Sequence, residues 1–217
     1  GSELVEPDNT PGPAQIRNSN AWQLLAQVRS LGIEPCYSGI LPDREDITSA
    51  AIDTAAKSSD VLLLSGGVSA GDYDLVPDIL RKLGFLFAFD SVAMQPGRPT
   101  IFAHKEQVYV CGLPGNPVST FINFELLIRP FLYRLMGHDW QPLVVEARLA
   151  EAIRRKQTSR QSTVPVRFVT PSEVAPVEYH GSAHIHALTR ASGLVTIPVG
   201  QACLQKGDVV RVRSLSS

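Results

Sequence analysis

The sequence lacks the features that mark several large classes of protein. Its 217 residues include 20 Lys and Arg against 21 Asp and Glu, which gives a formal net charge of −1. Such a balance provides neither a basic surface for nucleic acid nor an acidic disordered tail. No apolar run approaches the roughly 18 residues of a membrane-spanning helix, and no signal peptide opens the chain. We therefore expect neither nucleic-acid nor membrane partners.

Cysteine is scarce and widely spaced. The three residues, Cys36, Cys111 and Cys203, are odd in number and form no CxxC pair. This pattern suits reduced thiols better than a disulfide framework. We therefore expect a cytoplasmic protein.

Two common nucleotide-binding motifs are also absent. The chain contains no GxxxxGK[ST] and no GxGxxG after a strand. It therefore lacks the phosphate-binding loops of ordinary ATPases and dinucleotide-binding proteins. A Ser/His/Asp grouping is not evident either. Any ligand site must therefore rest on other loops.

What the chain does contain, from residue 15 to about 137, is an alternation of strand-like and helix-like patterns. The helical patterns cover residues 20–32, 46–58, 74–84 and 116–137. The strand patterns cover residues 33–43, 60–67 and 99–113, the last as two strands about a turn near Lys105 and Glu106. Such alternation predicts an α/β domain with a doubly wound, mostly parallel sheet.

Polar residues and prolines mark where these helices should begin or bend. Asp46 is the expected N-cap of the second helix, and Asp74 lies at or near the N-cap of the third. Asn116 and Pro117 should cap and open the long fourth helix, which Pro130 should kink.

After residue 142 the pattern changes to short alternating segments. They are "LVVEARLA", "VPVRFV", "GLVTIPVG" and "DVVRVRSL", separated by turn signals at Gly193, Gly200 and Gly207. This arrangement predicts a small all-β, barrel-like domain. We place the domains at residues 1–140 and 141–217, with no defined element in residues 1–14.

The stretch "LLLSGGVSAGDYDLV", residues 62–76, is the most informative loop. Its consecutive leucines predict a strand buried on both faces. Gly66, Gly67 and Gly71 lack a β-carbon, so their amides can approach a ligand closely, and Asp72 and Asp74 add carboxylates beside them. Backbone amides suit anions and carboxylates suit cations. The loop therefore indicates a phosphate-plus-metal site, with a tight turn carrying solvated acids as the alternative.

Three glycine-rich connections should meet at one edge of the sheet. They are Gly39 to Asp46, Ser65 to Asp74 and Gly112 to Ser119. Ligands of open α/β sheets bind at the carboxyl ends of the strands, where such loops lie. Between the last two, Arg98 stands between Pro96 and Pro99 as a fixed cation able to hold an oxyanion through paired donors. Each feature alone is compatible with ordinary turns, but together they favour a phosphate-type ligand.

Several motifs in this order resemble one known family. "GILPDRED", "SSDVLLLSGGVSAGDYDLV", "VAMQPGRPT" and "GLPGNPVST" are similar to the molybdopterin molybdenumtransferases, the MoeA/gephyrin-E family of molybdenum cofactor synthesis. The β tail resembles that family's last domain in "GSAHIHALTRASGLVTIP" and "LQKGDVVRV". The resemblance covers essentially the whole chain. It implies the molybdopterin-binding fold followed by a small β barrel.

The resemblance also implies an activity and a set of residues. Family members insert molybdate into adenylylated molybdopterin and release AMP, with Mg²⁺ as a divalent cation. Asp43 and Asp74 match acids suited to hold Mg²⁺ and polarise the phosphoanhydride, and Glu3 matches a third acid. Arg98 stands where the family commonly has lysine, which keeps the charge and changes the geometry. The implied substrate-binding residues are Ser65, Gly66, Gly67, Ser69, Gly71 and Asp72; Pro96, Gly97, Arg98 and Pro99; and Pro114, Gly115, Asn116, Pro117 and Ser119.

Two other functions stay open at this point. One is a molybdopterin adenylyltransferase-like enzyme, against which the β tail and "GLPGNP" argue. The other is a gephyrin-like scaffold module that binds a partner's peptide. The resemblance further implies that this chain is the C-terminal half of a longer, homodimeric protein, with an adenylyltransferase as a possible partner.

Overall fold

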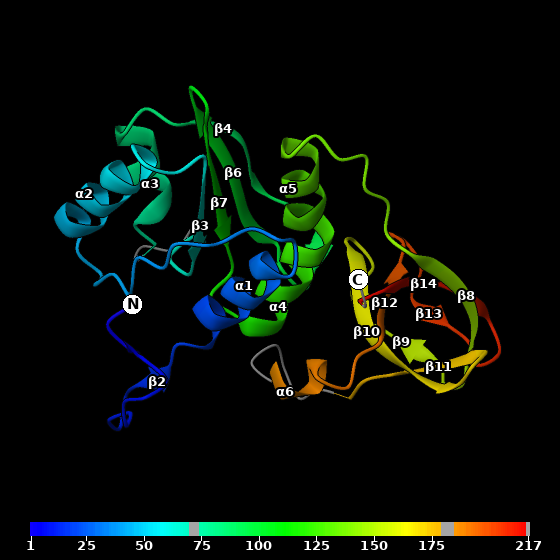
Figure 1. Cartoon of the computed structure of the whole chain (residues 1–217). Helices are drawn as coiled ribbons and strands as arrows, with labels where there is room; N and C mark the ends of the chain where they lie inside the picture. Colours follow the sequence, from blue (N-terminus) through cyan, green and yellow to red (C-terminus); the bar gives the residue numbers. More distant parts are fainter. Residues whose placement is uncertain (70–73, 179–184, 216–217) are drawn as a thin grey trace. The chain divides into compact units, whose positions relative to one another are not determined.

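The computed structural model describes residues 1–69, 74–178 and 185–215 (Figure 1). It contains two compact units. The α/β unit comprises Gly1–Val92 and Gly97–Phe124, and the β unit comprises Ala93–Pro96 and Glu125–Ser217. The predicted boundary between residues 140 and 141 stays a prediction.

The α/β unit is built on a four-stranded sheet. Its strands, in spatial order, are β3 (Val61–Ser65), β7 (Val108–Leu113), β6 (Pro99–Lys105) and β4 (Leu86–Ser91). β3 and β7 are parallel, whereas β7 with β6 and β6 with β4 are antiparallel. The α/β class is confirmed, but the described sheet is mixed rather than mostly parallel.

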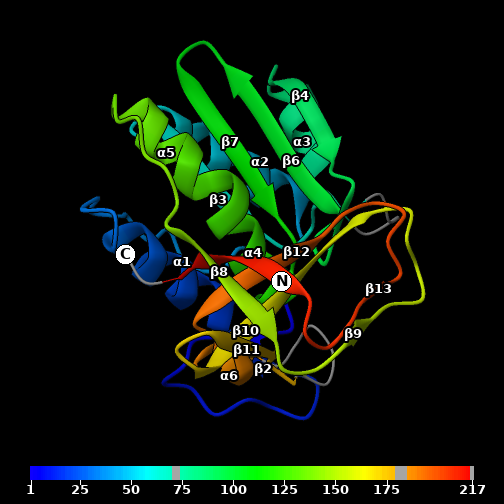
Figure 2. The ribbon, with the colours of Figure 1, turned by 90° about the vertical axis from the view of Figure 1, so that its right-hand side faces the viewer.

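Helices cover both faces of this sheet. They are α1 (Ser19–Arg29), α2 (Glu45–Ala56), α3 (Val76–Lys82) and α4 (Pro117–Asn123). α2 and α3 lie together on one face and α4 lies on the other, beside α1 (Figures 1 and 2). The core under α2 and α3 includes Ile52, Ile79, Leu80, Ile101 and Val110, which are almost fully buried. Apolar side chains at helical spacing thus fix the helices to the sheet.

Three expectations for this unit are wrong. Residues 33–43 form no strand. Pro35 has no backbone N–H to donate to a neighbouring strand, and Gly39 turns the chain at a φ of +90°. The N-cap of α2 is Arg44 rather than Asp46, which lies in the first turn and accepts two bonds from the Arg44 guanidinium. In β3 only Leu62 is buried, since this strand pairs with β7 alone and lies at the edge of the described sheet.

Two other features were not anticipated. β4 follows α3 and pairs with β6, although its sequence shows no clear alternation. Near the start of the chain, β1 (Leu4–Val5) and β2 (Ile16–Arg17) form a short parallel pair.

The predicted turn between β6 and β7 is confirmed, with Glu106 at a φ of 53°.

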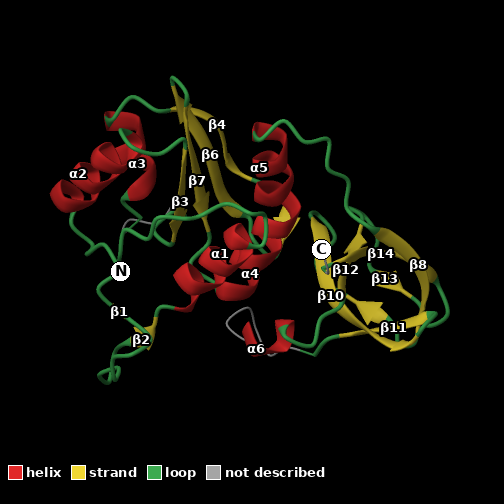
Figure 3. Ribbon diagram, viewed as in Figure 1, coloured by secondary structure: helices red, strands yellow, loops and turns green. Residues whose placement is uncertain are grey.

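The β unit is a small barrel, as predicted (Figure 3). Its main strands are β8 (Val144–Leu149), β10 (Gln161–Thr170), β11 (Glu173–Pro176), β12 (Gly193–Ile197) and β14 (Val209–Ser214). They pair in the order β11-β8-β14-β12-β10, and β10 closes the ring on β11. The shorter elements of the unit are β5 (Met94–Gln95), β9 (Ile153–Arg154), β13 (Cys203–Leu204) and α6 (Ile185–Leu188).

Gly193 is not a turn residue. It begins β12 and pairs with Val166 on one side and Ser214 on the other. A β-carbon there would overlap the Val212 side chain and the Arg213 carbonyl, so glycine is needed for close packing. The turns at Gly200 and Gly207 are confirmed by φ values of 86° and 89°.

The long helix after residue 116 is irregular beside its proline. α4 continues into a π-helical segment, η1 (Phe124–Ile128), and then into α5 (Arg129–Leu135), where Pro130 is in the first turn. Within the β unit, a buried ion pair joins η1 to α5, in which Arg129 Nε donates to Glu125 Oε2 at 2.7 Å and Nη2 donates to Oε1 at 3.0 Å. Arg213 donates to the Glu125 carbonyl and lies over the Trp140 ring.

Candidate functional site

The first loop of the candidate site follows β3. Gly66 and Gly67 have φ values of 86° and 65°, a region that residues with a β-carbon rarely adopt. The Gly67 carbonyl accepts a bond from Val76 N at 3.2 Å, which ties the loop to the start of α3. Ser69 is exposed, whereas Gly71 and Asp72 lie outside the described residues. The glycines therefore give the chain the sharp turn that the sequence indicated.

The second loop follows β7 and touches the first. Ser65 pairs with Leu113 across the parallel strands, and Ser65 Oγ donates to the Pro114 carbonyl at 3.3 Å. A β-carbon on Gly115 would lie 3.5 Å from Gly66 Cα, so the two backbones approach closely. These contacts confirm that two of the predicted glycine-rich loops lie at one edge of the sheet.

Hydroxyl bonds hold the second loop in shape. Thr120 Oγ1 donates to the Pro114 carbonyl at 2.5 Å and lies 3.0 Å from the Asn116 carbonyl. Asn116 is the N-cap of α4 and Pro117 is its first residue, as predicted. Ser119 is buried, so its side chain is not presented to solvent.

Asn20 joins the two loops, and sequence reasoning missed it. From the first turn of α1, its Nδ2 donates to Ser65 Oγ at 2.7 Å and to the Gly115 carbonyl at 2.8 Å. Asn18 places it by capping α1, with Oδ1 accepting from Ala21 N at 3.2 Å. A polar residue in a first helical turn is ordinary in a sequence, and only its distant partners identify this one.

Arg98 is presented on a short loop between β5 and β6. Its side chain is exposed and forms no hydrogen bond or ion pair with another described residue. Its carbonyl accepts from Val92 N at 2.9 Å, and Gly97 beside it is buried. An exposed guanidinium on an anchored backbone is well suited to bind an oxyanion. Pro96 belongs to the β unit, so it is not placed relative to the rest of this site.

The three predicted metal ligands are only partly brought together. Asp43 accepts a bond from Ser2 N at 2.9 Å, and its Oδ1 lies 3.6 Å from the Gly1 ammonium. The Ser2 N–H, followed by that ammonium, lowers the pKa of Asp43, which therefore stays ionised at neutral pH. Glu3 also lies against Gly1, whereas Asp74 immediately precedes Leu75, the N-cap of α3. Among the described residues, no group of three His, Cys, Asp or Glu side chains is arranged to hold a metal.

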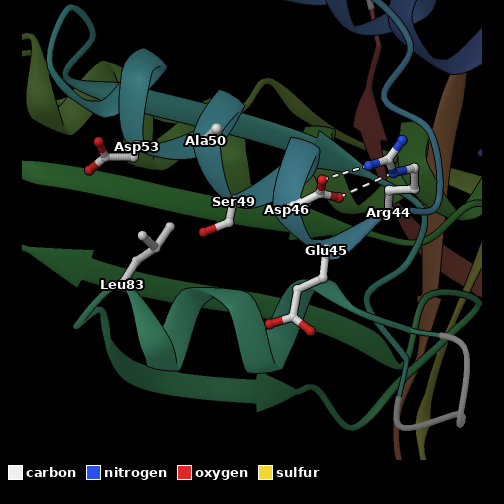
Figure 4. A pocket seen from close by; sticks show the side chains of 7 residues that line it. All are labelled: Arg44, Glu45, Asp46, Ser49, Ala50, Asp53 and Leu83. Atoms are coloured by element: carbon white, nitrogen blue, oxygen red, sulfur yellow. Dashed lines mark hydrogen bonds and ion pairs between the residues drawn. The ribbon is translucent and has the colours of Figure 1, made fainter.

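A hollow of about 720 Å³ on the α/β unit lies along α2 (Figure 4). Its lining residues are Arg44, Glu45, Asp46, Ser49, Ala50, Asp53 and Leu83, none of which is a predicted site residue. Its carboxylates are already compensated, because Asp46 pairs with Arg44, Asp53 with Lys57 and Glu45 with Lys82. We therefore assign no role to it.

Two family descriptions match the sequence. "Probable molybdopterin binding domain" matches residues 1–134, and "MoeA C-terminal region (domain IV)" matches residues 146–215. The chain belongs to the MoeA family. The resemblance seen in the sequence motifs is thereby confirmed.

Relatives in this family are similar along the whole of this chain. The molybdopterin molybdenumtransferase of Bacillus subtilis is 32% identical over 219 aligned residues, which cover 98% of this chain and 50% of that protein. The same-named protein of Nostoc sp. is 31% identical, covering 99% and 51%. The crystal structure of a molybdopterin biosynthesis moea protein from Pyrococcus horikosii matches at 30% identity and a TM-score of 0.86, covering 99% and 52%. The chain thus spans about half the length of the curated relatives it matches.

No helix in the described part of this MoeA-family chain is long and apolar enough to cross a membrane. Cys36, Cys111 and Cys203 are free cysteines. Burial raises the pKa of the Cys111 thiol to about 12, so it stays protonated within β7.

The Asn20 contacts predict a measurable loss of stability. Asn20→Ala removes both bonds that join the loops and should lower the free energy of unfolding by about 1–2 kcal/mol, because each net hydrogen bond contributes about 0.5–1.5 kcal/mol. Urea denaturation measures this change. Ser19→Ala, in the same helical turn, is the control and should shift stability by less than about 0.5 kcal/mol. Equal stability of the two variants would show that Asn20 does not join the loops.

Proposed function

We propose that this chain carries the substrate site of a molybdopterin molybdenumtransferase, which inserts molybdate into adenylylated molybdopterin and releases AMP. The observation that carries this proposal is the contact between the loops at Ser65–Gly67 and Pro114–Gly115, joined by Asn20. Backbone amides at such turns bind phosphate oxygens, because the N–H groups can converge on an anion. The names of the relatives support the same chemistry.

Each loop has a separate part in this proposal. The loop of Ser65, Gly66, Gly67 and Ser69 receives the phosphates of the adenylylated substrate, with Gly71 and Asp72 continuing it. The loop from Pro114 to Ser119 lines the pterin end through Gly115, Asn116 and Pro117, whereas the Ser119 side chain is buried. Arg98, between Pro96 and Pro99, binds molybdate, since its guanidinium is exposed and makes no ion pair with a described residue.

The acids would hold a divalent cation. Glu3 and Asp43 both lie beside Gly1, which brings these two carboxylates into one neighbourhood. Carboxylate oxygens are the ligands that Mg²⁺ prefers, so the donor chemistry fits. When bound, Mg²⁺ would polarise the phosphoanhydride for hydrolysis. Asp74 is proposed as the third acid on the sequence resemblance alone.

The setting of the reaction is part of the same proposal. We infer that the longer protein is a homodimer that works in the cytoplasm and receives its substrate from a molybdopterin adenylyltransferase. The free cysteines Cys36, Cys111 and Cys203 suit a reducing compartment. The dimer and the adenylyltransferase follow from the resemblance.

The direct test is release of AMP from adenylylated molybdopterin by the longer protein that contains this chain. Asp74→Asn keeps the size of the side chain and removes its charge, so Mg²⁺-dependent AMP release should fall on the order of a hundredfold or more. Asp78→Asn is the matched control, because Asp78 lies in the first turn of the same helix and pairs with exposed Arg81. Equal turnover by both variants would remove Asp74 from the mechanism.

Arg98 should govern molybdate rather than the nucleotide. Loss of a charge-assisted pair costs about 1.5–3 kcal/mol, so Arg98→Ala should raise the molybdate KM roughly ten- to hundredfold and leave AMP affinity nearly unchanged. Arg98→Lys should fall between the two. Arg29→Ala, which removes an exposed arginine paired with Glu34, is the control. Weaker AMP binding with unchanged use of molybdate would reverse the two ends of the substrate.

A further inference from the structure

The loop that carries Arg98 rests on a buried polar cluster. Asn123 Nδ2 donates to the Gly97 carbonyl at 2.8 Å and to Thr100 Oγ1 at 2.5 Å. Thr100 Oγ1 in turn donates to the same Gly97 carbonyl at 2.9 Å. Asn123 is 0% exposed and Thr100 is 1% exposed, so water does not compete for these bonds. The carbonyl that precedes Arg98 is therefore held by two side chains at once.

Gly97 is fitted to Asn123. Its φ is +99°, and a β-carbon on it would overlap the side-chain amide of Asn123. Asn123 Oδ1 has no hydrogen-bond donor among the described residues and faces the position that such a β-carbon would take. The hydrogen that Gly97 carries in place of a β-carbon leaves room for that oxygen.

The cluster contributes more than packing. What the cluster does provide is direction, because hydrogen bonds specify the orientation of the Gly97 carbonyl and apolar packing does not. The neighbouring side of Arg98 is fixed as well, through its carbonyl bond to Val92 N and the restricted φ of Pro99.

We propose that Asn123 is a positioning residue which, together with Thr100, sets the direction in which Arg98 presents its guanidinium to the oxyanion. This inference rests on the function proposed above for Arg98. Asn123 touches no substrate, and it acts through the backbone of Gly97. Asn123 is the last residue of α4, the helix that begins at the second glycine-rich loop.

The test compares single and double variants of the longer protein, with molybdate and adenylylated molybdopterin as the varied substrates. Asn123→Leu keeps the branching at Cγ with a larger side chain and removes the donor, and should raise the molybdate KM on the order of tenfold. The KM for adenylylated molybdopterin should stay unchanged. In the Arg98→Ala background, Asn123→Leu should have no further effect on molybdate, because residues that act through one another are not additive.

A second pair of variants covers the case in which Asn123→Leu does not fold. Thr100→Val removes one bond to the Gly97 carbonyl and should raise the molybdate KM severalfold. Thr100→Ser keeps the hydroxyl, so its molybdate KM should equal that of the unmodified protein. Ile122→Val, in the same helix and fully buried, controls for loss of stability and should leave the molybdate KM unchanged. Thermal denaturation of every variant confirms that it is folded.

Three outcomes would overturn the inference. The first is a rise in molybdate KM that is equal with and without Arg98, which indicates a general structural role for Asn123. The second is unchanged molybdate KM in folded Asn123→Leu or Thr100→Val protein while Arg98→Ala remains defective. The third is unchanged molybdate KM in Arg98→Ala itself, in which case the proposed function of Arg98 fails first.

Discussion

The parallel pairing of β3 with β7 is the constraint on which the site depends. Its register places Ser65 opposite Leu113, so the chain leaves both strands at the same edge of the sheet. Two glycine-rich turns then meet, and a β-carbon on Gly115 would lie 3.5 Å from Gly66 Cα. The bonds from Asn20 to Ser65 and Gly115 depend on that register. A one-residue slip would turn Ser65 to the opposite face and separate these partners.

The side-chain amides of Asn20 and Asn123 fix loop conformations that the glycines only permit. Glycine permits a sharp turn and does not specify one, because it loses more conformational freedom on folding than other residues do. Asn20 fixes the two touching loops, and Asn123 fixes the carbonyl before Arg98. Both side chains use an Nδ2 donor with two acceptors. The proposed site therefore combines glycines, which permit its sharp turns, with asparagines whose hydrogen bonds hold those turns in place.

Local sequence signals predicted the parts of the fold that depend on local chemistry. The turns at Gly66 and Gly67, the start of α4 at Pro117 and the barrel strands all follow from residue type and spacing. A strand also needs a partner, which is why residues 33–43 were misjudged and β4 was missed. The roles of Asn20 and Asn123 were not predicted for a similar reason. Their acceptors, the carbonyls of Gly115 and Gly97, lie 95 and 26 residues away along the chain. Their roles become visible only when the sheet is assembled.

The most direct measurement is the position of a heavy oxyanion in crystals of the protein. Tungstate has the charge and shape of molybdate and scatters X-rays strongly enough to be located by anomalous diffraction. We expect one ordered tungstate within hydrogen-bonding distance of the Arg98 guanidinium, and its loss in crystals of Arg98→Ala. An ordered tungstate held elsewhere, with Arg98 still extended into solvent, would contradict it.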